Sequence, residues 1–223
     1  MSASIKTTKN KKFIASYSGG KDSTLAIYRA ILQGMEPMEL ITTYNIDKER
    51  SWFHGIPQPL LNRISKEINI PITLIKTSGE KYAENFEAKL RSAKEAGAEV
   101  CVFGDIDIED HLKWCTDRCK AVGLESYFPL WKEERRKLVY EFIDLGFKTI
   151  ITVIDNTRML DKHVGAILTR EVAEEIAEHG ADICGENGEY HTFAFDGPLF
   201  SNPVVFDKGK KIEVDNYTII PIS

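Results

Sequence analysis

The chain has 223 residues, of which 43% are hydrophobic and 28% charged, as is ordinary for a folded globular protein of one domain, with or without a smaller appendage. The net charge of −5 argues against a large nonspecific nucleic-acid-binding surface, because such a surface needs a basic excess. Four cysteines in a chain of this length are no disulfide framework, so we expect a reducing, cytoplasmic compartment. Whether the protein forms a homo-oligomer stays open.

The first half of the chain has the pattern of an α/β protein. Residues 1–11 are rich in Ser, Thr and Lys, so we expect a flexible leader with no signal peptide or membrane span. After them, short apolar runs alternate with segments whose apolar residues recur at helical spacing, which predicts β-α-β units and a Rossmann-like doubly wound parallel sheet. The expected strands, each followed by a helix, cover residues 13–17, 39–44, 72–75 and 100–103.

The pattern changes after Gly123. The elements expected there are a crossover, a helix, a β-branched strand and a short helix, over residues 126–131, 134–145, 147–154 and 169–179. From Gly185 onward, glycines, aromatics and β-forming residues predict an antiparallel tail with a turn at Asp207-Lys208-Gly209. We therefore expect one domain over residues 12–125 and a smaller C-terminal α/β domain over residues 126–223.

Ser18-Gly19-Gly20-Lys21-Asp22-Ser23 lies between the first expected strand and its helix. Glycines let phosphate oxygens approach backbone N–H groups, and a helix N-terminus adds unsatisfied donors and the positive end of its dipole. Ser18 and Ser23 can supply hydroxyl donors and Lys21 a positive charge, while Asp22 can cap the helix or hold Mg²⁺. The segment therefore predicts a phosphate-binding loop.

Two better-known phosphate-binding loops do not fit this segment. A Walker A loop needs Gly six residues before its Lys and Ser or Thr directly after it, but Ala15 and Asp22 occupy those places. A dinucleotide-binding fingerprint needs three glycines in the pattern G-x-G-x-x-G, and only the adjacent pair Gly19-Gly20 is present. An ordinary turn between strand and helix remains the alternative.

Further polar residues follow the expected strands. Asp105 comes after a strand expected to be central, where doubly wound sheets bind ligands, and His54 lies in the loop after the second strand. Glu186, Glu189 and His191 lie in a Gly-containing turn, where acid–base catalysis, metal binding and acceptor recognition are all open to them. Cys115 and Cys119 fall on an apolar helical stripe and are expected to be buried structural thiols.

The glycine loop resembles that of the PP-loop ATP pyrophosphatases. His54-Gly55-Ile56-Pro57, Gly104-Asp105-Ile106, Phe128-Pro129-Leu130-Trp131 and Gly185-Glu186-Asn187-Gly188-Glu189-Tyr190-His191-Thr192 then follow in the order seen in the diphthine–ammonia ligase family. The resemblance covers nearly the whole chain beyond the leader. It implies an adenine nucleotide alpha hydrolase-like fold, with ATP on the loop and the C-terminal domain closing over the acceptor.

The resemblance also implies a reaction. In the family's namesake reaction, ATP activates a carboxylate of diphthine on elongation factor 2 as an adenylate, and ammonia displaces AMP. The chain has no room for a glutaminase domain, so free ammonia is the expected donor. The predicted nucleotide-binding residues are Ser16, Ser18, Gly19, Gly20, Lys21, Asp22, Ser23, His54 and Gly104. The predicted catalytic residues are Lys21, Asp105, Glu186, Glu189 and His191, and Asp22 and Asp105 are the predicted Mg²⁺ ligands.

The C-terminal motif departs from the diphthamide branch of the family at two positions. Asn187 stands where that branch has Gly, and His191 where it has Glu. In this the chain is similar to a bacterial side branch whose acceptor is suspected to be a different, corrinoid-related small molecule. Two other functions are weighed: a tRNA-thiolating PP-loop protein, which would need a catalytic cysteine pair and a basic face, and a non-catalytic module that binds ATP or AMP.

Overall fold

A computed structural model of the chain describes residues 9–51, 54–77 and 79–223. Most of the expected leader, residues 1–8, lies outside the described residues. The part of it that is described is attached to the fold, because Asn10 donates its backbone N–H to the carbonyl of Gly34 over 2.8 Å. No helix in the described ranges is long and apolar enough to cross a lipid bilayer.

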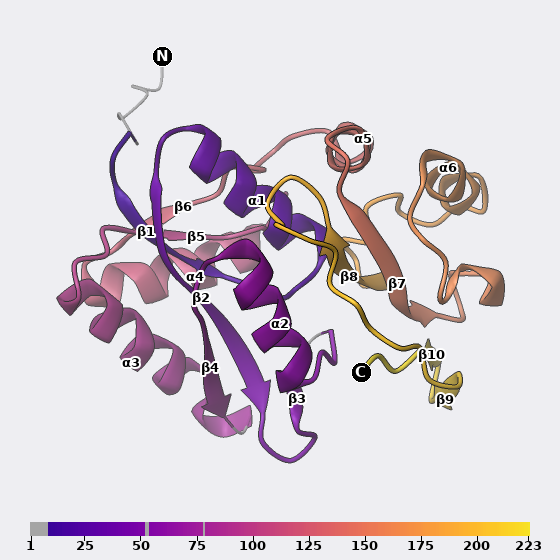
Figure 1. Ribbon diagram of the computed structural model, residues 1–223, viewed down its shortest axis with the longest axis horizontal. Helices are drawn as coiled ribbons and strands as arrows, with labels where there is room; N and C mark the ends of the chain where they lie inside the picture. The colour runs from indigo at the N-terminus through magenta and orange to yellow at the C-terminus, as the bar shows by residue number, and fades with distance from the viewer. Residues whose placement is uncertain (1–8, 52–53, 78) are drawn as a thin grey trace.

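The first half of the chain forms a mainly parallel sheet (Figure 1). Five parallel strands lie in the order β4 (Ile72–Thr77), β2 (Glu36–Asn45), β1 (Lys12–Ser16), β5 (Val100–Val102) and β6 (Glu125–Tyr127). The two-residue strand β3 (Arg50–Ser51) pairs antiparallel with the end of β2. After β1 the chain adds β2 and β4 on one side of it, and then crosses back to add β5 and β6 on the other side. The loops after β1 and β5 therefore border the switch point, where such sheets bind ligands.

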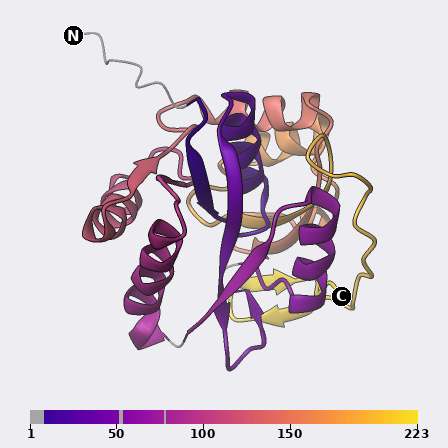
Figure 2. The same cartoon turned by 60° about the vertical axis from the view of Figure 1, so that its left-hand side comes forward.

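Helices cover both faces of this sheet because the buried strand residues alternate between two apolar clusters. Ile14 belongs to the cluster beneath α3 (Tyr82–Glu95) and α4 (Glu109–Val122), where Cys115 and Cys119 are buried as expected. Phe13 and Ala15 point the other way, toward α1 (Lys21–Leu32) and α2 (Gln58–Ile68). Figure 2 shows α3 and α4 on one side of the sheet and α2 with the C-terminal half on the other.

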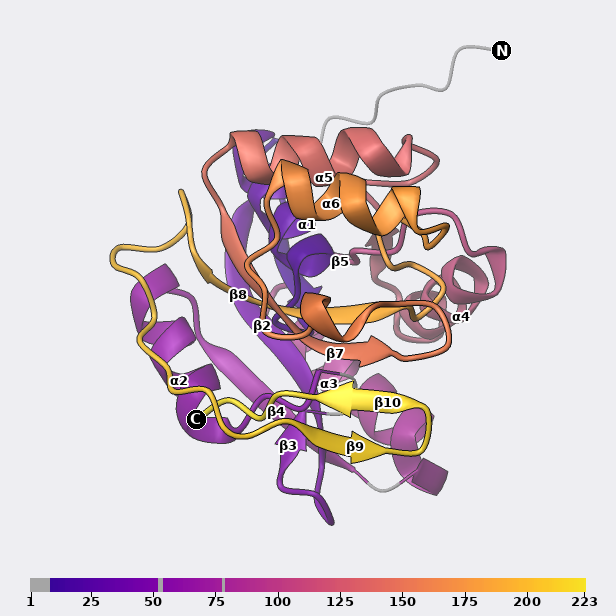
Figure 3. The ribbon, with the colours of Figure 1, turned by 90° about the vertical axis from the view of Figure 1, so that its right-hand side faces the viewer.

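The second half forms an antiparallel sheet beneath two helices, α5 (Arg135–Asp144) and α6 (Arg170–Glu178) (Figure 3). Its strands lie in the order β8 (Tyr190–Asp196), β7 (Lys148–Asp155), β10 (Tyr217–Ile219) and β9 (Ile212–Val214). Short 3-10 turns occupy Gly79–Lys81 and Asp161–His163. Apolar side chains of both halves share one cluster, which includes Phe13 and Phe142. The division into residues 12–125 and 126–223 therefore stays a prediction.

Two sequence-based expectations are wrong in detail. The expected crossover begins inside β6, because residues 125–127 pair with β5 and add a strand to the edge of the first sheet. The hairpin of the tail turns at Asp215 and Asn216, between the paired residues Val214 and Tyr217, and not at residues 207–209. Asp215 takes a left-handed conformation, with φ 52°, which Asp tolerates. Residues 207–209 instead run alongside the C-terminus, where Gly209 donates to Pro221 over 2.8 Å.

Candidate active site

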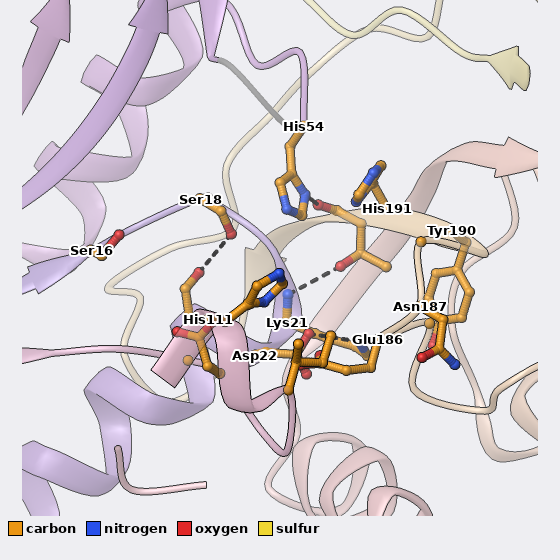
Figure 4. Close-up of a pocket in the computed structure, with 17 residues that line it drawn as sticks. Ser16, Ser18, Lys21, Asp22, His54, His111, Glu186, Asn187, Tyr190 and His191 are labelled. Carbon is orange, nitrogen blue, oxygen red and sulfur yellow. Dashed lines mark hydrogen bonds and ion pairs between the residues drawn. The ribbon is translucent and has the colours of Figure 1, made fainter. Parts of the chain in front are cut away.

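A cavity of about 480 Å³ opens at the carboxyl ends of β1 and β5 (Figure 4). Both halves of the chain line it, with Ser16, Ser18, Lys21, Asp22, Ser23, His54, Gly104, Asp105, Ile108, His111, Gly185, Glu186, Asn187, Gly188, Tyr190, His191 and Thr192. Most of the residues predicted from the sequence are thus brought together. The exceptions are Gly19, Gly20 and Glu189, which do not line the cavity.

Gly19 and Gly20 lie on the side of the loop that faces away from the cavity, where the loop packs against Ile56 and His54. Gly19 has φ +85°, and a Cβ added to it would lie 2.2 Å from Cδ1 of Ile56. A Cβ on Gly20 would lie 2.5 Å from Cε1 of His54. A side chain at either position would force Ile56 or His54 to move, and at Gly19 it would also strain the left-handed backbone, so glycine suits both positions beneath the His54 loop. Gly104 is equally confined, because its Cβ would lie 2.7 Å from the backbone nitrogen of Ser23.

Hydrogen bonds from within the loop and from the second sheet hold the loop in place. The hydroxyl groups of Ser18 and Ser23 form a hydrogen bond of 3.1 Å, and Gly20 donates its backbone N–H to Ser18 Oγ over 3.3 Å. Lys21 donates its backbone N–H to Thr192 Oγ1 over 3.1 Å. Ala194 donates to the carbonyl of Gly19 over 2.9 Å. Strand β8 thus braces the N-terminus of α1, although about 170 residues separate them in sequence.

Lys21 supplies a buried positive charge beside the cavity. Its side chain is only 5% exposed, and its Nζ lies 2.8 Å from Asp22 Oδ2 and donates to the carbonyl of Cys184. The ammonium also lies 5.2 Å from the ring centre of Tyr190. Burial opposes the charge, but the Asp22 carboxylate and its neighbours outweigh burial and hold the pKa of Lys21 well above its usual value.

Three carboxylates, Asp22, Asp105 and Glu186, line the same cavity. Glu186 Oε1 accepts the backbone N–H of Ile106 over 3.3 Å. Burial, reinforced by the negative charges of Asp22 and Asp105, raises the pKa of Glu186 to about 7. His111 Nδ1 lies 3.3 Å from Asp105, and this hydrogen bond raises the pKa of the imidazole. The cavity therefore contains more negative charge than Lys21 alone neutralises.

These carboxylates raise the question of whether the cavity can bind Mg²⁺. Among the residues with a described position, no three His, Cys, Asp or Glu side chains form a cluster able to hold a metal ion by themselves. Protein-bound Mg²⁺ more often uses one or two carboxylates together with the phosphates of a nucleotide. Asp22, in the Ser18–Ser23 segment, and Asp105, in the loop after β5, line one cavity and fit that kind of shared site.

Two neutral imidazoles form one wall of the cavity. His54 Nδ1 lies 2.7 Å from the carbonyl oxygen of Thr192. A carbonyl only accepts hydrogen bonds, so Nδ1 carries the proton and Nε2 keeps a free lone pair. The rings of His54 and His191 lie 4.9 Å apart, centre to centre. Burial, His191 and Lys21 lower the pKa of His54 to about 3, and burial and Lys21 also lower that of His191.

Glu189 points away from the cavity. Its carboxylate accepts hydrogen bonds from Arg158 Nη1 over 3.2 Å and from the backbone N–H of Asn187 over 3.1 Å, and the residue is 4% exposed. Arg158 is held in turn by Asp155, whose Oδ2 lies 2.9 Å from Arg158 Nε. These contacts tie the Glu186–Glu189 turn to the end of β7, so Glu189 is placed to position Glu186 and Asn187.

Arg135 joins two loops at the edge of the cavity. Its guanidinium lies 2.7 Å from Asp107 Oδ1, in the loop after β5, and 2.6 Å from Asp182 Oδ2. Asp182 Oδ2 also accepts the backbone N–H of Glu186 over 2.8 Å. This ion-pair network fixes the distance between the Asp105 loop and the Glu186 turn. Nothing in the local sequence around Arg135 indicates that role.

Sequence reasoning omitted several residues that line the cavity. Asn187, Tyr190 and Thr192 lie inside the C-terminal motif, and their inclusion needed only the assumption that the whole motif faces the site. His111, at the start of the helix that follows Asp105, is compatible on sequence grounds with either acceptor contact or a solvated helix face, and the structure places it in the cavity lining. The first sheet is parallel and has a Ser-Gly-Gly-Lys loop at its switch point, and polar residues of the second sheet cover that loop. This combination defines an enzyme of the PP-loop class.

Comparisons with known proteins place the chain more closely. Residues 11–126 match the model of the diphthamide synthase N-terminal domain, and residues 134–221 match that of the C-terminal domain. The diphthine–ammonia ligase of Danio rerio is 30% identical over 230 residues, covering 92% of this chain and 90% of that protein. That of Rattus norvegicus is 26% identical, covering 87% and 82%. The chain belongs to the diphthamide synthase family.

Other matches are shorter or more distant. The diphthine–ammonia ligase of Mus musculus is 33% identical over 98 residues, which cover 42% of this chain and 37% of that protein. The match to the Bos taurus protein covers 64% of that protein's length. A predicted subunit of tRNA methyltransferase from Methanocaldococcus jannaschii aligns at 17% identity over 82% of this chain and 96% of its own, with a TM-score of 0.43.

Proposed function

We propose that the protein is an ATP-dependent ligase that converts ATP to AMP and pyrophosphate, activates a carboxylate as its adenylate and joins it to ammonia. The observation that carries this proposal is the convergence of the Ser18–Ser23 loop and the Gly185–Thr192 motif on one cavity. Diphthine on elongation factor 2 is the proposed acceptor, because the relatives that match over most of the chain are named diphthine–ammonia ligases. The four free, buried cysteines support a cytoplasmic location.

The proposed nucleotide site uses the loop between β1 and α1. Phosphate oxygens would accept hydrogen bonds from Ser18 and Ser23 and face the ammonium of Lys21. Asp22 and Asp105 would hold Mg²⁺ together with the phosphates, and the ion would offset the charge that develops on the departing pyrophosphate. The three carboxylates around the site disfavour phosphate binding without such a cation.

The proposed reaction has two steps. An oxygen of the acceptor carboxylate attacks the α-phosphorus of ATP, and the bond from that phosphorus to the bridging oxygen breaks, so that pyrophosphate leaves. The nitrogen of ammonia then attacks the acyl carbon, the bond to the AMP oxygen breaks, and the nitrogen loses a proton. Glu186 can accept this proton because its pKa is raised to about 7. His54, with a pKa of about 3, is too weak a base for that task, but its Nε2 lone pair can orient an ammonia N–H.

One observation favours a second acceptor. Asn187 and His191, the two departures from the diphthamide form of the motif, both line the cavity. Because both departures change the lining of the cavity, we propose a corrinoid-related small-molecule carboxylate as the alternative acceptor.

The test is a product assay on the purified protein with ATP, Mg²⁺ and ammonium. One reaction receives elongation factor 2 carrying diphthine, and another receives cobyrinate as a corrinoid carboxylate. We expect AMP together with an amide, detected by the mass of the acceptor, only when ATP, ammonium and the right acceptor are all present. Bound ATP without AMP formation in both reactions would contradict the proposed reaction with these two acceptors.

A further inference from the structure

A second cavity, of about 660 Å³, lies directly behind the histidine wall of the first. The two cavities share His54, Gly188 and His191. The second cavity lies between the β2–β3 hairpin and the β9–β10 hairpin, whose neighbouring positions are visible in Figure 3. The substrates of a ligase must meet where the new bond forms, and these two cavities meet at the two imidazoles.

The chemistry of the second cavity differs from that of the first. Its charged lining residues are Lys48, Arg50 and Asp215, so two cationic side chains face one carboxylate. Neither Lys48 nor Arg50 forms an ion pair within the described part of the chain; Arg50 Nε only donates to the carbonyl of Lys48 over 3.3 Å. The first cavity has the opposite balance, with Asp22, Asp105 and Glu186 against Lys21.

Apolar side chains form the rest of the second cavity. Val153, Ile219 and Ile222 line it, and so do Val214 and Tyr217, which are 48% and 40% exposed. A largely apolar hollow with a few charged groups is the usual form of a site that binds one end of an organic molecule. The free cations at its edge favour a ligand that carries a negative charge beside an apolar body.

We propose that this second cavity is the acceptor subsite, and that Arg50 and Lys48 attract and hold the carboxylate before it is activated. This inference rests on the proposed function. The Cδ of Arg50 would lie 3.7 Å from a Cβ on Gly55, the residue after His54, so the arginine stem lies beside the shared wall. A carboxylate held there lies next to the wall of His54 and His191 that both cavities share, while the apolar part of the acceptor occupies the hollow between the hairpins.

The experiment compares Arg50→Gln and Lys48→Gln with the wild type. Arg91→Gln is the matched control, because Arg91 is an exposed arginine of α3 that lines neither cavity. With diphthine-bearing elongation factor 2 as acceptor, we expect Arg50→Gln to raise the KM for the acceptor about tenfold, as the loss of a charged hydrogen bond would. The KM for ATP should not change, and Arg91→Gln should match the wild type.

A binding measurement without ATP separates this inference from the proposed reaction. Calorimetry is performed with diphthine-bearing elongation factor 2 and, separately, with free diphthine. Weaker binding of either probe to Arg50→Gln, but not to Arg91→Gln, supports the acceptor subsite even if the wild type forms no amide. Binding of free diphthine identifies a small-molecule acceptor as sufficient, and binding of the protein probe alone shows that the surrounding protein is recognised too. Equal binding to wild type and Arg50→Gln, or no saturable binding of either probe to the wild type, would overturn the inference.

Discussion

His54 donates its Nδ1 proton to the backbone carbonyl of Thr192 across 2.7 Å, and this hydrogen bond joins loops that lie 138 residues apart in sequence. The same imidazole packs against Gly20, where an added Cβ would lie 2.5 Å from its Cε1. The phosphate loop, the His54 loop and the C-terminal motif are therefore in contact with one another. A substitution in one of these segments should therefore alter the positions of the other two.

This contact predicts how Gly20 variants fail. Gly20→Ala should weaken ATP binding, and Gly20→Val should abolish it while the protein stays folded, because the new side chain displaces the imidazole of His54 and the loop beneath it. The double variant Gly20→Ala with His54→Ala should bind ATP more tightly than Gly20→Ala alone, since the colliding ring has been removed. Calorimetric titration with ATP measures all of these affinities. If the double variant is no better, the added carbon blocks the phosphates directly.

Glu186 should make the stability of the protein depend on pH. Its pKa is raised in the folded state from 4.5 to about 7, first by burial and then by Asp22. A carboxyl group raised in this way contributes stability in full below about pH 4.5, and the contribution is lost as pH rises through 7. Glu186→Gln never acquires the charge, so between pH 5 and 8 it should gain up to about 3 kcal/mol relative to the wild type.

Chemical unfolding at pH 5 and pH 8 measures this difference. Glu178→Gln is the control, because Glu178 is exposed at the end of α6 and distant from the cavity. Its difference from the wild type should be the same at both pH values. A Glu186→Gln variant whose relative stability does not rise between the two pH values would show that Glu186 is not the carboxyl group that titrates near neutrality.

Glu189 should act through the turn that it holds. Glu189→Gln should cost on the order of 1–3 kcal/mol of folding free energy, because it replaces a buried carboxylate that pairs with Arg158. ATP binding should be spared, and the acceptor reaction should be slowed through the displaced turn. Arg158→Gln should reproduce both effects, and a double-mutant cycle should show that the two changes are coupled. Glu189→Gln that abolishes turnover at unchanged stability, with Arg158→Gln fully active, would restore the direct catalytic role expected from the sequence.

The cysteines of α4 should be structural. Cys119 is fully buried in the apolar cluster between α4, α3 and the sheet, and Cys115 is buried with its Sγ 3.9 Å from Asp105 Oδ2. Replacement of each by Ala should cost about 1–2 kcal/mol of stability, and activity per folded molecule should persist. Unfolding curves and active-site-normalised rates test this. Zinc in the purified protein, or lost turnover at full stability, would instead favour a thiol-based function.

The parts of the site that sequence reasoning identified are those whose residues are neighbours in the chain. The Ser18–Ser23 loop follows a continuous buried strand and precedes a helix, and local chemistry alone requires its glycines and its lysine. Asp105 was found in the same way, since it follows β5, whose residues are all buried. In both cases the strand direction dictates where the polar residue lies.

The parts that sequence reasoning could not identify depend on distant partners. Glu186 and Glu189 look equivalent in the motif, but Arg158 draws Glu189 away from the cavity, and Asp182, tied to Arg135, holds the Glu186 end. The pairing of β6 with β5 involves three residues and leaves little periodic signal. The hairpin turn at Asp215 was missed because Gly209 offered a stronger local turn signal nearby.

The most direct measurement uses ATP labelled at the α- or the γ-phosphate, with Mg²⁺, ammonium and elongation factor 2 that carries diphthine. A PP-loop holds the β,γ-pyrophosphate as the leaving group while a nucleophile attacks the α-phosphorus. We therefore expect α-label in AMP, γ-label in pyrophosphate, and one AMP for each amide formed. ADP with inorganic phosphate, however tightly ATP binds, would contradict the proposed chemistry.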